Sequence, residues 1–317
     1  MKIVFLDALT LGDDIDLSGF SDLGEVEIYG TSNEEEIIAR SADADVLITN
    51  KLKLNKDNLS GAANLKLICV TATGFDNIDV SYAKDQGIGV CNVVGYSTSS
   101  VAQLTAGFAL SLINKQTQYR RSVASGEYSS RGVANILTPT YHELEGKTWG
   151  IVGFGNIGKR VACIAEALGC RVIVNKRVPE AGVECVDIDA LCRESDIISV
   201  HTPLNEDTRG LISRERIALM RDGAILINVA RGAVCDESAV AQAVKDGKLG
   251  GFACDVYSAE PFGESHPYAN IKELDNVILT PHMAWGAYEA RVRLCEEVKK
   301  NIFAYFSGEI RNRVDLK

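Results

Sequence analysis

Short runs of apolar, often β-branched residues alternate with amphipathic stretches along the chain. The first runs cover residues 2–7, 25–30, 45–50, 65–70 and 87–93, and the later ones cover 148–153, 171–175, 196–201, 224–230, 251–256 and 276–282. Helix-like stretches such as NEEEIIARSA and VSYAKDQ separate them. This alternation predicts an α/β fold with parallel strands. Five runs followed by six predict two sheets.

Two further segments lie outside these sets. Residues 98–145 join an apolar helical stretch, VAQLTAGFALSLI, to a polar loop that is long enough to cover a site or a partner subunit. After the last run, residues 287–306 carry apolar side chains at helical spacing, at Val292, Cys295, Val298, Ile302 and Phe306. This terminal helix needs an apolar surface, which the first sheet offers.

The length and the charge narrow the class of protein. A chain of 317 residues exceeds one hydrophobic core of ordinary size, which favours two domains. A net charge of -10 disfavours binding to nucleic acid or to an anionic membrane. The start, MKIVFLD, lacks the pattern of a signal peptide, and VAQLTAGFALSLI is too short to span a bilayer. We therefore expect a cytoplasmic protein that acts on a small molecule.

The cysteines and histidines give no metal-ligand pattern. Nine cysteines form no CxxC pair, and none of the four histidines stands at metal-ligand spacing from another histidine or from a cysteine. Scattered thiols of this kind are typical of core residues in a reducing compartment. We predict no metal site.

A glycine-rich turn begins the second half. In TWGIVGFGNIGKRVA, Gly153, Gly155 and Gly158 follow a predicted strand and open a predicted helix at Asn156 and Ile157. A second strand, RVIVN, completes a βαβ unit whose backbone N–H groups and helix N-terminus would hold a pyrophosphate. The unit predicts a Rossmann-type dinucleotide site; a tight turn without a ligand is the alternative.

The end of the RVIVN strand departs from the NAD-binding pattern. An acidic residue that binds the ribose 2'-hydroxyl is expected there, whereas Asn175, Lys176 and Arg177 occupy the position. Two cations would suit a 2'-phosphate, which predicts NADPH, or use of both NADP and NAD with a lean toward NADPH. The alternative is a solvated pair of cations without a cofactor contact.

Three later segments end predicted strands with residues suited to carbonyl reduction. VARGAV presents Arg231, VYSAEP presents Glu260, and LTPHMAW presents His282. A histidine held protonated by a carboxylate is a proton donor, and an arginine binds a carboxylate through two parallel hydrogen bonds. Each residue has an ordinary structural alternative when it is taken singly. Together they predict a catalytic site.

These segments resemble, in order and over nearly the whole chain, the D-isomer-specific 2-hydroxyacid dehydrogenases. The resemblance rests on TGFDNIDV, GIVGFGNIGKRVA, HTPLNEDTRGLI, INVARGAVCDESAV, ACDVYSAEP and ILTPHMAW. It implies two doubly wound domains with the active site in the cleft between them. A flavodoxin-like substrate domain would comprise residues 1–97 plus 287–317, and a Rossmann domain would comprise residues 98–286. It also implies that Arg231, Glu260 and His282 are catalytic.

The resemblance extends to residues that bind the ligands. Cofactor contacts are implied at Thr202, Pro203, Ala230 and Asp255, with Asp255 on the nicotinamide carboxamide. Backbone amides around Thr73, Gly74 and Phe75 would hold the substrate carboxylate, and Lys51 would face the substrate. Ordinary strand-end turns and caps are the alternatives at Gly74 and Asp255.

Within the family, NVVGYSTSSVAQ, ITNKLKL and PHMAWGAYEAR look most like glycerate dehydrogenases, also called hydroxypyruvate reductases. The substrate would be hydroxypyruvate or glyoxylate. Phosphoglycerate dehydrogenase is less favoured because no regulatory domain follows residue 317. Formate dehydrogenase is less favoured because this chain has Glu260 at the position where that subfamily carries a glutamine. The segment 98–145 resembles the family's dimerisation arm, which implies a homodimer. A dinucleotide-sensing corepressor, which shares this fold, is the alternative from another class.

Overall fold

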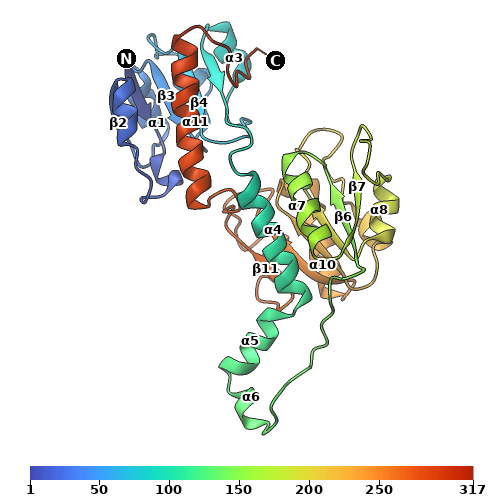
Figure 1. Cartoon of the computed structure of the whole chain (residues 1–317). Coiled ribbons are helices and arrows are strands. Elements are labelled where there is room, and N and C mark those ends of the chain that lie inside the picture. The colour runs from blue at the N-terminus through green and yellow to red at the C-terminus, as the bar shows by residue number, and fades with distance from the viewer. Residues whose placement is uncertain (317) are drawn as a thin grey trace. The chain divides into compact units, whose positions relative to one another are not determined.

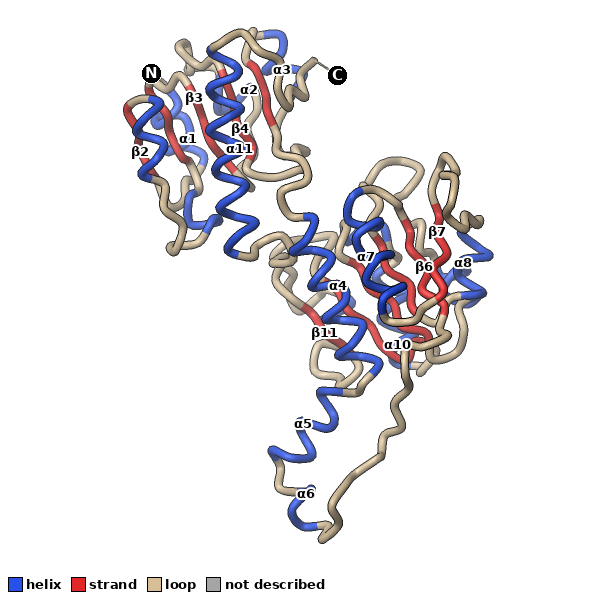
Figure 2. Tube along the Cα trace, viewed as in Figure 1, coloured by secondary structure: helices blue, strands red, loops and turns tan. Residues whose placement is uncertain are grey.

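The structure is a computed structural model that describes residues 1–316 as two compact units. Unit 1 comprises Met1–Ser97 and the segment that begins at Trp285, and unit 2 comprises Thr98–Ala284. Each unit is a parallel sheet with helices on its faces (Figure 1, Figure 2). The prediction of an α/β fold with two parallel sheets is confirmed.

Unit 1 contains a five-stranded sheet in the order β2-β1-β3-β4-β5 within the described residues. This is the strand order of flavodoxin-like folds. The strands are β1 (Lys2–Phe5), β2 (Glu25–Ile28), β3 (Val46–Thr49), β4 (Leu67–Val70) and β5 (Gly89–Cys91). The helices are α1 (Glu34–Ser41), α2 (Lys56–Leu59), α3 (Val80–Asp85) and α11 (Tyr288–Phe306), with 3-10 turns η1 (Ala8–Leu11) and η2 (Ser18–Leu23).

The alternation of side chains along β1 explains why this sheet is covered on both faces. Ile3 and Phe5 point into a core shared with α11, whereas Val4 and Leu6 point into a core shared with α1, α2 and α3. All four side chains are at most 1% exposed. Full burial of such a side chain stabilises a fold by about 1.5–3 kcal/mol, so a strand that is apolar on both faces requires both layers of helices.

Helix α11 returns the end of the chain to the first sheet. Its inward face, with Leu294, Cys295, Val298 and Ile302, packs against Ile3, Phe5, Leu67 and Cys69. The opposite face carries Phe303, which is 63% exposed. Asn301 is buried in this helix and donates from Nδ2 to the carbonyl of Asn92 at 3.0 Å, which fixes the helix along the sheet.

Unit 2 contains a six-stranded sheet in the order β11-β10-β9-β8-β6-β7 within the described residues. The strands are β6 (Thr148–Val152), β7 (Arg171–Asn175), β8 (Ile197–Val200), β9 (Ala224–Asn228), β10 (Leu249–Cys254) and β11 (Val277–Leu279). The helices are α4 (Thr98–Ile113), α5 (Gln116–Ala124), α6 (Glu127–Ser130), α7 (Asn156–Ala167), α8 (Ile188–Glu194), α9 (Arg214–Leu219) and α10 (Glu237–Lys245), with 3-10 turns η3 (Gly232–Val234) and η4 (Pro267–Asn270).

The strand order of unit 2 is that of a Rossmann sheet with one strand reduced to a bridge. Val174 of β7 pairs in parallel with Cys185, which stands where the third strand of the order 3-2-1-4-5-6 would lie. The chain reverses its winding between β6 and β8. Ligands of open α/β sheets bind at such a point, outside the carboxyl ends of the strands.

Helices cover both faces of this sheet as well. Helices α8, α9 and α10 share one core with the sheet, and α4 and α7 pack against each other and against the other face (Figure 1). Beyond α4, helices α5 and α6 and the chain that follows project away from the sheet of this unit (Figure 2). Helix α5 in this segment was not predicted, and the chain predicted as a polar loop contains one further helical turn, Glu127–Ser130.

A pair of neighbours on α11 tests the packing of unit 1. Ile302 is fully buried, so Ile302→Ala should lower the free energy of unfolding by about 2–5 kcal/mol, whereas the exposed Phe303→Ala should change it by less than about 1 kcal/mol. Urea denaturation followed by the fluorescence of Trp285 in a Trp149→Phe background reports on unit 1. Equal destabilisation by the two variants would contradict this packing.

Candidate active site

The predicted site residues of unit 2 lie where its strands end. Because the paired strands run parallel, their carboxyl ends share one edge of the sheet. The residues that follow these ends are Gly153 after β6, Lys176 after β7, Thr202 and Pro203 after β8, Ala230 and Arg231 after β9, Asp255 and Glu260 after β10, and His282 after β11. The fold thus brings segments that are far apart in sequence to one edge.

Each glycine of the loop after β6 has its own structural reason. Gly153 has φ +92°, and a Cβ there would lie 2.7 Å from the backbone nitrogen of Thr202. A Cβ on Gly158 would lie 2.3 Å from the carbonyl oxygen of Gly153, so only glycine allows α7 to approach β6 this closely. A Cβ on Gly155 would meet no described atom within 4 Å.

The open side of this loop fits a dinucleotide. Helix α7 begins with Asn156 and Ile157 and runs for 12 residues. The residue before it is Gly155, which has no side chain and therefore cannot cap the first N–H groups of the helix. Unpaired N–H groups at a helix start, with the positive end of the helix dipole, attract a phosphate. The space in front of Gly155 is the room that a pyrophosphate needs.

The end of β7 carries a carboxylate that the sequence pattern did not place there. The Nζ of Lys176 lies 2.5 Å from Oε2 of Glu180, and the Nζ of Lys159 lies 2.7 Å from Oε1 of the same residue. Hydrogen bonds from Lys159 and Lys176 stabilise the charged form of Glu180 and therefore lower its pKa. Of the expected pair of cations, Lys176 therefore belongs to a cluster of Lys159, Lys176 and Glu180, here called the Lys176 cluster, in which Glu180 is the counterion.

The neighbours of Lys176 differ in how they are engaged. The Nδ2 of Asn175 donates to the carbonyl of Val186 at 3.1 Å, so this amide helps to hold β7 against the segment that follows. Arg177 is exposed. The Nζ atoms of Lys159 and Lys176 lie 5.8 and 5.9 Å from the ring centroid of Phe154 in the glycine loop. The Lys176 cluster thus adjoins the glycine loop.

A buried amide shapes the turn that bears Arg231. Asn228, fully buried at the end of β9, accepts a hydrogen bond from the N–H of Ala230 at 3.0 Å and donates to the carbonyl of Arg231 at 3.0 Å. The guanidinium of Arg231 donates to the carbonyl of Ala230 at 2.8 Å and remains partly exposed. Asn228 was not predicted as a site residue, because an amide at a strand end is ordinary in sequence.

Glu260 and His282 form a close pair. The Nδ1 of His282 lies 2.6 Å from Oε2 of Glu260, and the two side chains are 23% and 30% exposed. The other carboxylate oxygen of Glu260 accepts the N–H of Tyr257 at 2.9 Å. His282 has φ +53°, an unusual backbone conformation for a residue other than glycine. The turns after β10 and β11 thus bring a carboxylate and an imidazole together.

Asp255 is almost fully buried and is occupied by protein donors. It accepts hydrogen bonds from Thr280 Oγ1 at 2.5 Å, from the N–H of Met283 at 2.9 Å and from the N–H of Ala284 at 2.8 Å. Burial raises the pKa of Asp255, and these hydrogen bonds oppose the rise. Thr280 before His282 and Met283 and Ala284 after it therefore attach the turn that bears His282 to Asp255. This anchoring was not foreseen, and the predicted contact with a nicotinamide stays a prediction.

The predicted substrate residues of unit 1 share an edge of their own sheet. Lys51 follows β3, and Thr73, Gly74 and Phe75 follow the neighbouring β4. The Nδ2 of Asn77 donates to the carbonyl of Leu52 at 2.9 Å, which ties the two loops together. Buried Asp7 accepts the N–H groups of Asn50 and Lys51 and so anchors the first loop. The structure thus groups these residues within unit 1.

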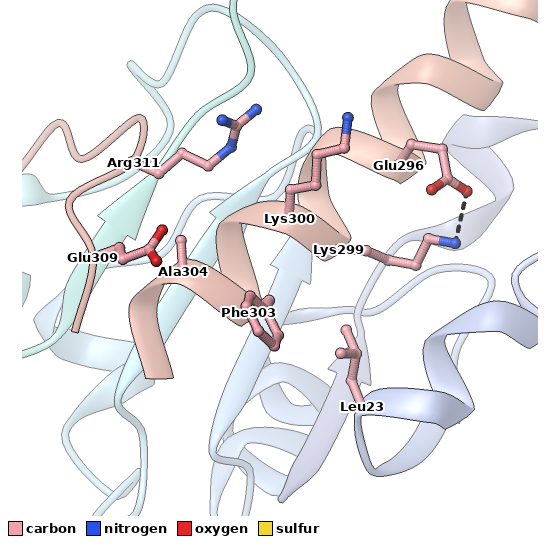
Figure 3. Close-up of a pocket in the computed structure, with 8 residues that line it drawn as sticks. All are labelled: Leu23, Glu296, Lys299, Lys300, Phe303, Ala304, Glu309 and Arg311. Carbon is pink, nitrogen blue, oxygen red and sulfur yellow. Dashed lines mark ion pairs between the residues drawn. The ribbon is translucent and has the colours of Figure 1, made fainter. Parts of the chain in front are cut away.

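The pocket in Figure 3 lies on α11 of unit 1, and none of the predicted site residues lines it. Its volume is about 390 Å³, and the residues that line it are Leu23, Glu296, Lys299, Lys300, Phe303, Ala304, Glu309 and Arg311. Lys299 pairs with Glu296 at 2.6 Å, and Lys300 and Arg311 both pair with Glu297. Because its cations already have acidic partners, this pocket does not resemble a site for an anionic substrate.

Residues 1–316 contain neither a cluster of metal ligands nor a helix that could span a membrane. No group of three His, Cys, Asp or Glu residues in this part of the chain is placed to hold a metal ion. No helix there combines the length and the apolar character needed to cross a membrane.

Comparison with known proteins gives the family. The family model described as "D-isomer specific 2-hydroxyacid dehydrogenase, NAD binding domain" matches residues 106–284. A glycerate dehydrogenase of Methylorubrum extorquens is 36% identical over 315 residues, which cover 99% of both chains. The chain belongs to the D-isomer-specific 2-hydroxyacid dehydrogenase family.

Solved structures agree with this assignment. One is a D-lactate dehydrogenase from Aquifex aeolicus complexed with NAD and lactic acid. It matches with a TM-score of 0.84 and 31% sequence identity, and the match covers 99% of this chain and 99% of that chain. An acyclic imino acid reductase, Bsp5, in complex with NADPH and D-Arg, has a TM-score of 0.85 and 31% identity over 99% of this chain and 100% of its own. The protein is a D-2-hydroxyacid dehydrogenase whose cofactor is a nicotinamide dinucleotide.

Two glycines of the loop allow a paired test of this dehydrogenase. Gly158→Ala should destabilise unit 2 by about 1–3 kcal/mol, because its Cβ would meet the Gly153 carbonyl. Gly155→Ala should leave stability nearly unchanged but weaken NADH binding, because the added methyl group enters the open space before α7. Thermal denaturation and NADH fluorescence titration measure the two effects. Unchanged affinity in Gly155→Ala would place the pyrophosphate elsewhere.

Proposed function

We propose that this dehydrogenase reduces a small 2-oxoacid, hydroxypyruvate or glyoxylate, to the D-2-hydroxyacid with NADH or NADPH. The observation that carries the proposal is the 2.6 Å contact between His282 and Glu260, at the same sheet edge as the Arg231 turn and the glycine loop. This edge combines a proton donor, a cation for a carboxylate and a dinucleotide fold. The resemblance to glycerate dehydrogenases favours hydroxypyruvate.

In this mechanism Arg231 binds the substrate carboxylate. A guanidinium presents two parallel N–H groups to a carboxylate, which fixes the orientation of the substrate. We further propose that backbone amides around Thr73, Gly74 and Phe75 contribute to this binding and that Lys51 faces the substrate. An oriented 2-oxoacid presents its carbonyl carbon to the nicotinamide in a single geometry, which is a large part of catalysis.

His282 supplies the proton. The bound dihydronicotinamide supplies the hydride that reduces the carbonyl carbon. As negative charge develops on the carbonyl oxygen, protonated His282 donates its Nε2 proton to that oxygen, and Glu260 stabilises the imidazolium from the Nδ1 side. Arg231 also stabilises the developing charge. The sum is 2-oxoacid plus NAD(P)H plus a proton giving the D-2-hydroxyacid plus NAD(P)+.

The kinetic test of this proposal uses two cofactors and four substrates. Steady-state rates for NADH and NADPH would be measured with hydroxypyruvate, glyoxylate, pyruvate and 3-phosphohydroxypyruvate. We expect the highest kcat/KM with hydroxypyruvate or glyoxylate. A preference for 3-phosphohydroxypyruvate would favour the phosphoglycerate dehydrogenase alternative. No oxidation of either cofactor with any substrate would favour the dinucleotide-sensing alternative.

Replacement of the proton donor tests the mechanism. His282→Asn should lower kcat by roughly 100-fold or more and leave NADH affinity within about twofold, since general acid catalysis contributes factors of about 100 to 10,000. His142→Asn is the matched control, because His142 is exposed in the segment after α6. Turnover of His282→Asn near that of the parent would refute the assignment.

For the cofactor we propose NADPH, or use of both dinucleotides with a lean toward NADPH. Lys176 and Arg177 are cations at the end of β7, and Asn175 stands beside them. Thr202, Pro203 and Ala230, which end neighbouring strands, and Asp255 would complete the contacts. The preference should be modest, because Glu180 partly neutralises Lys176 and because the Lys176 side chain is 22% exposed.

Two substitutions separate the roles of the charges in this cluster. Lys176→Asp should shift the ratio of kcat/KM for NADPH over NADH by roughly tenfold toward NADH, since a like charge would repel a 2'-phosphate. Glu180→Gln should shift the ratio toward NADPH by removing the counterion. Glu184→Gln is the control, because Glu184 pairs with Arg171 at the start of β7. Unchanged ratios in both variants would mean that these side chains face only water.

We also propose a homodimer joined through α5, α6 and the chain that follows them. This segment exposes large apolar side chains, including Val123 at 62%, Val133 at 56% and Leu137 at 68%. Apolar residues gathered on one projecting segment favour contact with a second protein surface. The family's dimerisation arm is the precedent for this segment.

A further inference from the structure

We propose that Glu237 is a positioning residue that fixes the turn bearing Glu260 against the turn bearing Arg231. This inference rests on the proposed function, because it assigns Glu237 a role through Glu260. Glu237 is the first residue of α10, and it is 9% exposed although it is an acid at a helix start, where acids usually face water.

The carboxylate of Glu237 is held by Ser258. Its Oε1 accepts the N–H of Ser258 at 2.9 Å, and its Oε2 accepts the hydroxyl of Ser258 at 2.5 Å. The start of a helix also stabilises a negative charge. A buried carboxylate is costly without donors, so these contacts explain why the charge is tolerated here. They attach the start of α10 to the turn after β10.

His266 backs this contact from within the same segment. It is 7% exposed, and its Nε2 lies 3.0 Å from Oε2 of Glu237. Its Nδ1 accepts the N–H of Tyr268 at 3.2 Å, which fixes the orientation of the ring. The ring also contacts the rings of Phe262 and Tyr268 at centroid distances of 4.9 and 5.0 Å. The segment from Ser258 to Tyr268 is thus folded around the Glu237 carboxylate.

The held turn is the one that orients Glu260. The N–H of Tyr257, next to Ser258, donates to Oε1 of Glu260 at 2.9 Å, and Oε2 of Glu260 faces His282. A chain of contacts therefore runs from Glu237 through Ser258 and Tyr257 to Glu260 and His282. Three contacts, Glu237 with Ser258, Tyr257 with Glu260 and Glu260 with His282, separate Glu237 from the proton donor, which makes it a positioning residue.

The same segment is attached to the Arg231 turn by a backbone contact. A Cβ on Gly232 would lie 2.1 Å from the carbonyl carbon of Tyr257 and 2.2 Å from the nitrogen of Ser258, so the two backbones touch. Gly232 follows Arg231 directly, and Glu237 begins the helix after η3. The segment 232–237 thus meets the 257–258 turn at both its ends. The contacts at Glu237 and Gly232 keep the carboxylate anchor and the proton donor in one rigid arrangement.

The test is Glu237→Gln, which keeps the shape and removes the charge. An amide cannot accept both hydrogen bonds of Ser258 with the same geometry, so the Glu260 turn should loosen. We expect kcat for the preferred 2-oxoacid to fall by roughly tenfold to 100-fold, since small misplacements of catalytic groups have effects of this size. NADH affinity should stay within about twofold. The fall in kcat at unchanged NADH affinity is the readout that a merely structural role of Glu237 would not give.

Two further variants keep the test interpretable. Ser258→Ala removes one of the two hydrogen bonds and should give a smaller loss of kcat, again at unchanged NADH affinity, even if Glu237→Gln does not fold. Glu264→Gln removes an exposed charge from the same segment and should match the parent, because the Glu264 side chain is 88% exposed. A parent-like kcat in both Glu237→Gln and Ser258→Ala would overturn the inference.

This outcome is distinguishable from failure of the proposed function. If the parent reduces none of the 2-oxoacids, or if His282→Asn retains turnover, the function is wrong. If the parent is active, His282→Asn is inactive and Glu237→Gln keeps the kcat of the parent, only the role of Glu237 is wrong.

Discussion

The parallel pairing of the strands in unit 2 is the constraint on which the candidate site depends. Parallel strands end at one edge of a sheet, and each is followed by a turn that must change direction within a few residues. In this chain those turns carry the glycine loop, Arg231, Glu260 and His282. Side chains that lie far apart in sequence can act on one small molecule only because this edge gathers them.

Buried carboxylates hold several of these turns in place. Asp7 accepts hydrogen bonds from backbone N–H groups that follow β3. Asp255 accepts them from Met283 and Ala284, which follow His282, and Glu237 accepts one from Ser258. Each acid thus gives backbone N–H groups of a turn a hydrogen-bond acceptor within the protein. These three acids therefore shape the loops. Glu260 accepts a backbone N–H as well but also contacts the imidazole of His282, and Glu180 contacts two lysines.

The charges around the glycine loop show how local pattern and fold combine. Lys176 and Lys159 come from β7 and α7, and Glu180 lies between their ammonium groups. A 2'-phosphate would have to compete with this carboxylate for both lysines. The proposal for cofactor selection therefore involves three charges, those of Lys159, Lys176 and Glu180, and for this reason the proposed preference is modest.

The sequence by itself determined the two parallel sheets, the glycine loop and the Arg231, Glu260 and His282 turns. These features depend on local rules: the apolar period of strands and helices, the freedom of glycine, and the motif order of a family. The tertiary structure decided the partners of those residues. Asn228 under the Arg231 turn, Glu180 between two lysines and Glu237 beneath Ser258 are ordinary polar residues in sequence. Their roles arise from contacts between different strands and turns, and the register of the sheet, a long-range property, sets those contacts.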